Sequence, residues 1–103
     1  RRIMEACHHP SVGICWNSND SDVVNGSVKQ SFDLLRPWVK NCHINELTSA
    51  YPWRELFTLL RHSGYDRYTL CEAAESKEPE RFLRWWKHYQ TVMRAEVASS
   101  ARP

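Results

Sequence analysis

The sequence has no excess of charge of one sign. Its 103 residues include 14 Lys and Arg against 12 Asp and Glu, a formal net charge of +2. Proteins that hold nucleic acid through long-range electrostatic attraction are far more basic than this. The charge balance therefore gives no reason to expect a nucleic-acid partner.

Long apolar runs are also missing. No segment approaches the roughly 20 apolar residues that cross a bilayer, and no apolar stretch of the kind found in a secretory signal follows Arg1–Glu5. We therefore expect no membrane partner. With 42% hydrophobic and 25% charged residues, the composition is typical of one small globular domain rather than of a disordered chain.

The cysteines form no C-x-x-C pair. There are four of them, Cys7, Cys15, Cys42 and Cys71. Three lie in apolar, strand-like runs, where a thiol packs as a small hydrophobic group. This pattern favours free thiols in a reducing, cytoplasmic compartment over a disulfide framework or a four-cysteine zinc site.

The sequence does contain a regular alternation of predicted strands and helices. The end of a helix is expected at 2–8, and apolar runs at 12–16, 38–44 and 67–72 predict three strands. A helix is expected from Ser27, where Gln30 completes a capping box, to Pro37. The next helix starts at Pro52 and ends at Gly64, which suits a left-handed C-cap. Strands that alternate with helices predict a parallel sheet.

The longest predicted helix begins at Pro79 and carries many aromatic residues. Its apolar positions follow a spacing of three and four, which predicts one buried stripe. The stripe consists of Phe82, Trp85, Trp86, Tyr89, Val92 and Met93.

Three strand–helix units predict an α/β fold and make up about three-eighths of a (β/α)8 TIM barrel. Each unit takes about 30 residues, and a whole barrel needs about 250. The competing interpretation is a doubly wound three-stranded sheet, which leaves two long edges unpaired. We expect the barrel part to span 1–98 and a disordered polar tail to span 99–103. We also expect either a piece of a longer protein or an association, as a homo-oligomer or with the remainder of the barrel, that covers the open edges.

Polar residues follow each predicted strand at its carboxyl end, which is where parallel α/β proteins bind ligands. The first strand continues through Trp16 to Asp20, the second through His43 to Glu46, and the third ends at Glu72. Oxygen and imidazole ligands from separate strands suit a divalent metal. A structural role for His43 is as open as metal ligation, because polar residues are common where strands end. Asn17 also suits a turn, since asparagine is frequent in turns after strands.

Five parts of the chain together show a resemblance to a known family. They are Val12–Asn19, Asn41–Leu47, Tyr51–Phe57, Gly64–Tyr68 and Glu72. In order and spacing, over residues 1–93, they resemble the carboxyl-terminal part of the xylose isomerase-like TIM barrels, the sugar phosphate isomerase/epimerase family. The resemblance implies that the parallel strands are those of the last three strand–helix units of a partial (β/α)8 barrel. The resemblance implies an enzyme that acts on a small ketose or sugar phosphate by proton transfer through an enediolate.

The resemblance also implies a divalent metal, commonly Mn, Mg, Co or Zn. The family holds it with a glutamate, an aspartate, a histidine and a second glutamate from successive strands. His43 matches the histidine, Glu72 matches the last glutamate, and Asn17 occupies the place of the aspartate. Glu72 would also be one of the two catalytic carboxylates that move the proton.

Several positions depart from the family pattern. Asn17 provides no charge to a metal, Asp20 stands where the epimerases place a substrate-binding histidine, and Ser49 replaces an arginine. The first glutamate would lie before residue 1, so we expect the chain to be inactive alone. The substrate-binding candidates are Trp16, Asn19, Asp20 and Glu46.

Two other functions remain open. A non-catalytic binding or assembly module on the same fold is favoured by Asn17 and Ser49. A DNA-repair enzyme similar to endonuclease IV is disfavoured, because its zinc cluster needs more ligands, including an Asp-x-His pair that this sequence lacks. The basic residues within 81–94 are interspersed with acidic ones nearby, which is typical of a solvated helix face.

Overall fold

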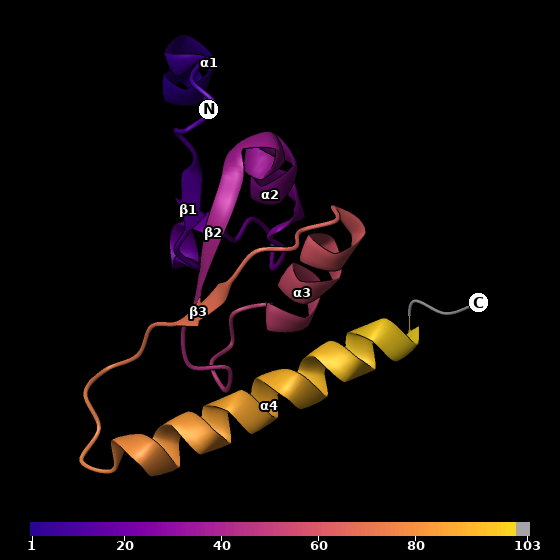
Figure 1. The fold of residues 1–103 in the computed structure, drawn as a ribbon. Helices are drawn as coiled ribbons and strands as arrows, with labels where there is room; N and C mark the ends of the chain where they lie inside the picture. The colour runs from indigo at the N-terminus through magenta and orange to yellow at the C-terminus, as the bar shows by residue number, and fades with distance from the viewer. Residues whose placement is uncertain (101–103) are drawn as a thin grey trace.

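The computed structural model describes residues 1–100 and shows a mixed α/β fold (Figure 1). Its sheet has three strands in the order β1-β2-β3, and both neighbouring pairs are parallel. The strands are β1 (Ile14–Trp16), β2 (Val39–Ile44) and β3 (Thr69–Cys71). The helices are α1 (Arg2–Cys7), α2 (Lys29–Leu35), α3 (Trp53–His62) and α4 (Pro79–Ser100), with short 3-10 turns η1 (Asp20–Asp22) and η2 (Arg36–Trp38). The predicted alternation and the parallel sheet are confirmed.

The sheet has one covered and one open face. Helices α2 and α3 pack on the covered face and α4 packs against α3, whereas α1 lies apart beyond the end of β1 (Figure 1). Because side chains alternate along a strand, Cys42 and Ile44 of β2 are buried beneath these helices. The other side, which we call the open face, carries Cys15, His43 and Leu70 and has no helix of the described chain over it.

The core lies between the covered face and the two central helices. Phe32 of α2 is buried against Trp16, with the two rings edge to face. Leu56, Phe57 and Leu60 of α3 are buried as their spacing predicts. Gly64, with φ +74°, ends α3 in the left-handed conformation, and the next amide, of Tyr65, donates to the carbonyl of Leu60.

The predicted buried stripe of α4 is confirmed at Trp86 and Met93, holds in part at Phe82, and is wrong at Trp85, Tyr89 and Val92. The buried residues are Trp86, Gln90, Met93 and Val97, whereas Trp85, Tyr89 and Val92 are exposed. Two adjacent stripes of this helix are apolar, and periodicity alone does not say which of them faces α3. The exposed rings of Trp85 and Tyr89 instead stack on each other, 5.6 Å between centroids.

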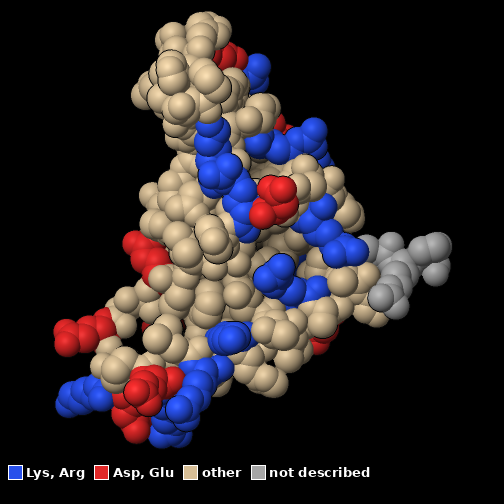
Figure 2. Space-filling model, viewed as in Figure 1, with Lys and Arg blue, Asp and Glu red and all other residues tan. Residues whose placement is uncertain are grey.

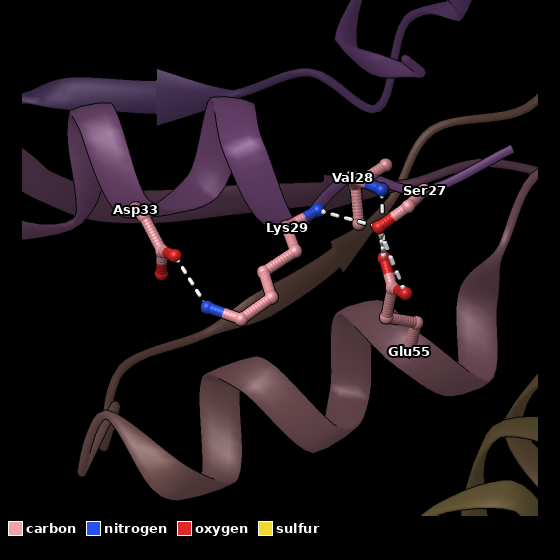
Figure 3. Close-up of polar contacts among 5 residues, drawn as sticks. All are labelled: Ser27, Val28, Lys29, Asp33 and Glu55. Atoms are coloured by element: carbon pink, nitrogen blue, oxygen red, sulfur yellow. Dashed lines mark hydrogen bonds and ion pairs between the residues drawn. The ribbon is translucent and has the colours of Figure 1, made fainter. Parts of the chain in front are cut away.

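The predicted capping box of α2 is also wrong in its partner (Figure 3). Ser27 does accept a hydrogen bond from the backbone N–H of Lys29, at 3.1 Å. The carboxylate that serves this end of the helix is not on Gln30 but on Glu55 of α3, which accepts from Ser27 Oγ and from the N–H of Val28. The side chain that caps this end of α2 is thus 27 residues from Val28 in the sequence, whereas the motif predicted that Gln30 would do so.

The structure describes only the first two residues of the predicted polar tail, 99–103. Ser99 and Ser100 still belong to α4, and 101–103 lie outside the described residues. No helix within residues 1–100 has both the length and the apolar character to pass through a membrane.

Candidate functional site

The side chains of His43 and Glu72 meet at the carboxyl end of the sheet. Nδ1 of His43 lies 2.8 Å from Oε2 of Glu72, and both side chains are partly exposed. When the Nδ1–H donates to the carboxylate, the ring is held in the tautomer whose Nε2 carries a lone pair. That is the form in which an imidazole binds a metal or accepts a proton.

The strand register explains why these two residues meet. His43 pairs with Leu70 and Ile44 pairs with Cys71 in the β2–β3 ladder. The ladder continues for one more bond, from the N–H of Glu72 to the carbonyl of Ile44, at 2.9 Å. Glu72 therefore lies two residues beyond Leu70, on the open face that His43 also occupies.

An amide-lined cavity of about 380 Å³ borders this pair. Its lining residues are Asn17, Asn19, Asn45, Glu72, Ala73 and Ala74. Three asparagines and a carboxylate offer several donors and acceptors within a small space. Asn17 also accepts a weak hydrogen bond from the thiol of Cys15, at 3.5 Å. The structure thus brings together four of the predicted site residues: Asn17, Asn19, His43 and Glu72.

Asn45 is a site residue that the sequence analysis missed. Its Nδ2 donates to the carbonyl of Ser18 at 3.3 Å, but its Oδ1 is buried and has no hydrogen-bond partner among the described residues. Ser18, with φ +58°, is itself fixed by a 2.7 Å bond from its hydroxyl to the carbonyl of His43. A buried acceptor without a partner is unfavourable.

Three of the predicted substrate-binding residues lie elsewhere. Trp16 is buried in the core, where its indole N–H donates to the hydroxyl of Tyr51 at 3.1 Å, and it does not line the cavity. Asp20 in η1 and Glu46 are exposed, and neither lines the cavity. Ser49 accepts a hydrogen bond from the indole N–H of Trp53, which gives it a structural role.

The donors at this site fit a divalent metal in part. His43 contributes an imidazole, Glu72 a carboxylate and Asn17 a neutral amide oxygen. Within residues 1–100, no group of three or more His, Cys, Asp or Glu side chains lies close enough to hold a metal ion. Protein metal sites use three or more well-placed ligands. His43 and Glu72 alone are fewer than that.

All four cysteines are free. Cys42 is the fully buried one, as predicted for a core thiol, and burial raises its pKa to about 12. Cys15 instead lies on the open face, and its pKa is raised by burial and by the negative charge of Glu72. Both shifts keep the thiols protonated near neutral pH.

No protein family, curated protein or solved structure was found that matches this chain. The assignment of function therefore rests on the geometry of the site and on the motif resemblance described above.

Proposed function

We propose that the chain is the carboxyl-terminal part of a sugar or sugar phosphate isomerase or epimerase with a xylose isomerase-like barrel. The contact between His43 and Glu72 carries this proposal, because it joins an imidazole and an acid from neighbouring strands at the ligand-binding end of a parallel sheet. The helices lie on one face of the sheet, and the acid and imidazole lie on the other. A barrel has the same division between its outer and inner faces.

The neighbouring cavity supports a polyhydroxy substrate such as a small ketose. Its asparagine amides can each donate to one hydroxyl and accept from another. Glu72 lies at the wall of the same cavity and is the residue we assign to proton transfer next to the substrate carbonyl.

A divalent cation, Mn, Mg, Co or Zn, would be held by His43 and Glu72 with the amide of Asn17. When bound, it would stabilise the negative charge that develops on an enediolate. By the resemblance, the family moves the proton with two carboxylates, and Glu72 is the one that this chain matches. We therefore propose that this chain binds but does not isomerise sugars on its own, in a cytoplasmic setting where its thiols stay reduced.

A non-catalytic binding or assembly module is the second candidate. It is favoured by β1 and β3, which are both edge strands with free hydrogen-bonding groups, and by the exposed rings on α4. In that case the open face would pair with a second copy or another chain. Catalysis would have no part in it.

Calorimetric titration with Mn²⁺ tests the proposed site. The variants His43→Ala and Glu72→Gln should each weaken binding by about tenfold or more. His88→Ala and Glu80→Gln remove the same chemical groups from the exposed side of α4 and should leave the affinity unchanged. Equal affinity for all four variants would falsify the metal site.

An isomerase assay with small ketoses tests the enzymatic part of the proposal. The chain alone should show no turnover. Measurable turnover would contradict the claim that a second proton-transfer group is needed. Sugar binding without Mn²⁺ binding would favour the module without catalysis.

A further inference from the structure

A second cavity lies at the opposite, amino end of β3. It has a volume of about 240 Å³. It is formed by the last turns of α3, the segment before β3 and the carboxyl-terminal half of α4. The lining residues are Phe57, Leu60, Arg61, Tyr65, Arg67, Thr69, Arg94 and Val97. Three of these carry guanidinium groups and none carries a carboxylate.

The three arginines come from three different elements. Arg61 lies in the last turn of α3, Arg67 precedes β3, and Arg94 lies on α4. Figure 2 shows basic side chains gathered over the region where these elements meet, with a smaller acidic patch beside them. Arg67 is held in place by a 2.6 Å hydrogen bond from its Nε to the carbonyl of Lys40. Its two terminal nitrogens take no part in that bond and can donate to a ligand.

These guanidinium groups have no acidic partner within residues 1–100. None of the ion pairs of the described chain includes Arg61, Arg67 or Arg94. The contrast with Arg54 is clear, because this residue also lies on α3 and pairs with Glu96 of α4 at 2.6 Å. The same two helices thus neutralise one arginine and leave two others facing a shared cavity.

The floor of the cavity is apolar. Phe57, Leu60 and Val97 are all buried in the core. A low-polarity floor weakens the screening of the charges above it, so an anion held there would interact more strongly than on an open surface. Thr69, at the start of β3, adds a hydroxyl that donates to Oε1 of Gln90 and can accept from a ligand.

We propose that this cavity binds a small phosphate-bearing anion, either inorganic phosphate or a phosphomonoester. Arginine forks match the oxygens of phosphate in a bidentate manner. The volume is below that of pockets for drug-sized ligands, which start at about 300 Å³, so it suits one phosphate group with a short substituent.

The phosphate site is separate from the site at the carboxyl end. Thr69 and Glu72 lie three residues apart on one extended segment, which corresponds to about 10 Å. The proposal therefore does not depend on the isomerase assignment, and either can fail alone.

Titration of the whole chain with inorganic phosphate, followed by calorimetry at low ionic strength, tests this site. Saturable binding is expected, and Arg61→Gln and Arg94→Gln should each weaken it about tenfold. Arg84→Gln removes the same charge from the exposed amino-terminal half of α4 and should change affinity by less than about twofold. Equal weakening by all three variants would show diffuse attraction and overturn the proposal, as would an absence of saturable binding.

Amide chemical shifts provide a readout that needs no variant. Phosphate should shift the amides of Thr69 and Val97, at the cavity, and leave those of Asn17 and Glu72 unchanged. The reverse pattern would place the anion at the carboxyl end and overturn the proposal. A parallel titration with glycerol phosphate distinguishes the two sources: tighter binding than inorganic phosphate assigns the site to a phosphomonoester.

Discussion

The carboxylate of Glu55 accepts a hydrogen bond from the backbone N–H of Val28, 2.7 Å away, and thereby joins the first turn of α3 to the start of α2 (Figure 3). The same carboxylate accepts from the hydroxyl of Ser27 at 2.8 Å. The free N–H groups at a helix start favour negative charge, so the contact stabilises α2 electrostatically as well as by hydrogen bonding. It also fixes the two helices relative to each other beneath the sheet.

Replacement of Glu55 should therefore destabilise the fold. We expect Glu55→Ala to lower the free energy of unfolding by about 1–2 kcal/mol, because it removes a charge-assisted cap and leaves a helix-start amide without its partner. Urea denaturation followed by circular dichroism measures this. Gln30→Ala, the local partner that the sequence motif suggested, should change stability by less than about 0.5 kcal/mol. Equal losses of unfolding free energy for Glu55→Ala and Gln30→Ala would contradict the capping of α2 by Glu55.

The mixed α/β class and the parallel sheet could be predicted from the sequence because strand and helix periods differ. Alternating or short apolar runs at 12–16 and 38–44 and the three-to-four spacing of Leu56, Phe57 and Leu60 each predict one element type, and the order of elements then predicts a parallel sheet. Periodicity did not predict that Glu55 caps α2, nor which side of α4 packs against α3. Both depend on contacts between segments far apart in the chain.

The candidate site was predictable from the same logic, applied to strand ends. Neighbouring residues on a strand point to opposite faces, so Trp16 and Asn17 were unsuited to one site together, and the structure places Trp16 in the core. The alternation also gives the signal for the missed residue. Asn45 follows His43 by two positions, which places it on the same face. Its unpartnered oxygen is a tertiary feature that no sequence pattern contains.

The adjacent residues Trp85 and Trp86 provide a matched test of how α4 packs. Trp86 is buried, and its indole N–H donates to the carbonyl of Asn45 at 3.1 Å, whereas Trp85 is exposed. Trp86→Ala should lower the free energy of unfolding by about 3–5 kcal/mol, because it leaves a cavity and an unsatisfied carbonyl. Trp85→Ala should lower it by less than about 1 kcal/mol. Thermal and urea unfolding distinguish the two variants, and a larger loss for Trp85→Ala would show that Trp85, rather than Trp86, packs against the core.

The buried thiol of Cys42 should make the fold less stable at alkaline pH. Burial raises the pKa of this thiol from 9.0 to about 12, so the folded chain keeps its proton while the unfolded chain loses it. The stability that this group contributes is present below pH 9 and is lost as the pH rises toward 12. The slope for one such group is at most about 1.4 kcal/mol per pH unit.

Comparison with Cys42→Ala isolates this effect from the other groups that titrate in the same range. The difference in unfolding free energy between wild type and Cys42→Ala should shrink across this pH window. Cys7→Ala removes an exposed thiol and serves as the control, with a difference that stays constant. A wild-type advantage over Cys42→Ala that does not change with pH would refute the assigned shift.

The reactivity of Cys15 should report the charge of Glu72. The pKa of Cys15 is raised first by burial and second by the Glu72 carboxylate, and the thiol lies on the open face where a reagent can reach it. Glu72→Gln removes the charge and should lower that pKa, which increases the thiolate fraction and speeds alkylation by iodoacetamide at about pH 8. Peptide mass spectrometry measures the rate at Cys15 separately from the other cysteines. Glu46→Gln changes an exposed carboxylate outside the cavity and should leave the rate unaltered. If both variants alkylate at the wild-type rate, Glu72 does not act on Cys15, and the arrangement of the open face on which the proposed site depends is wrong.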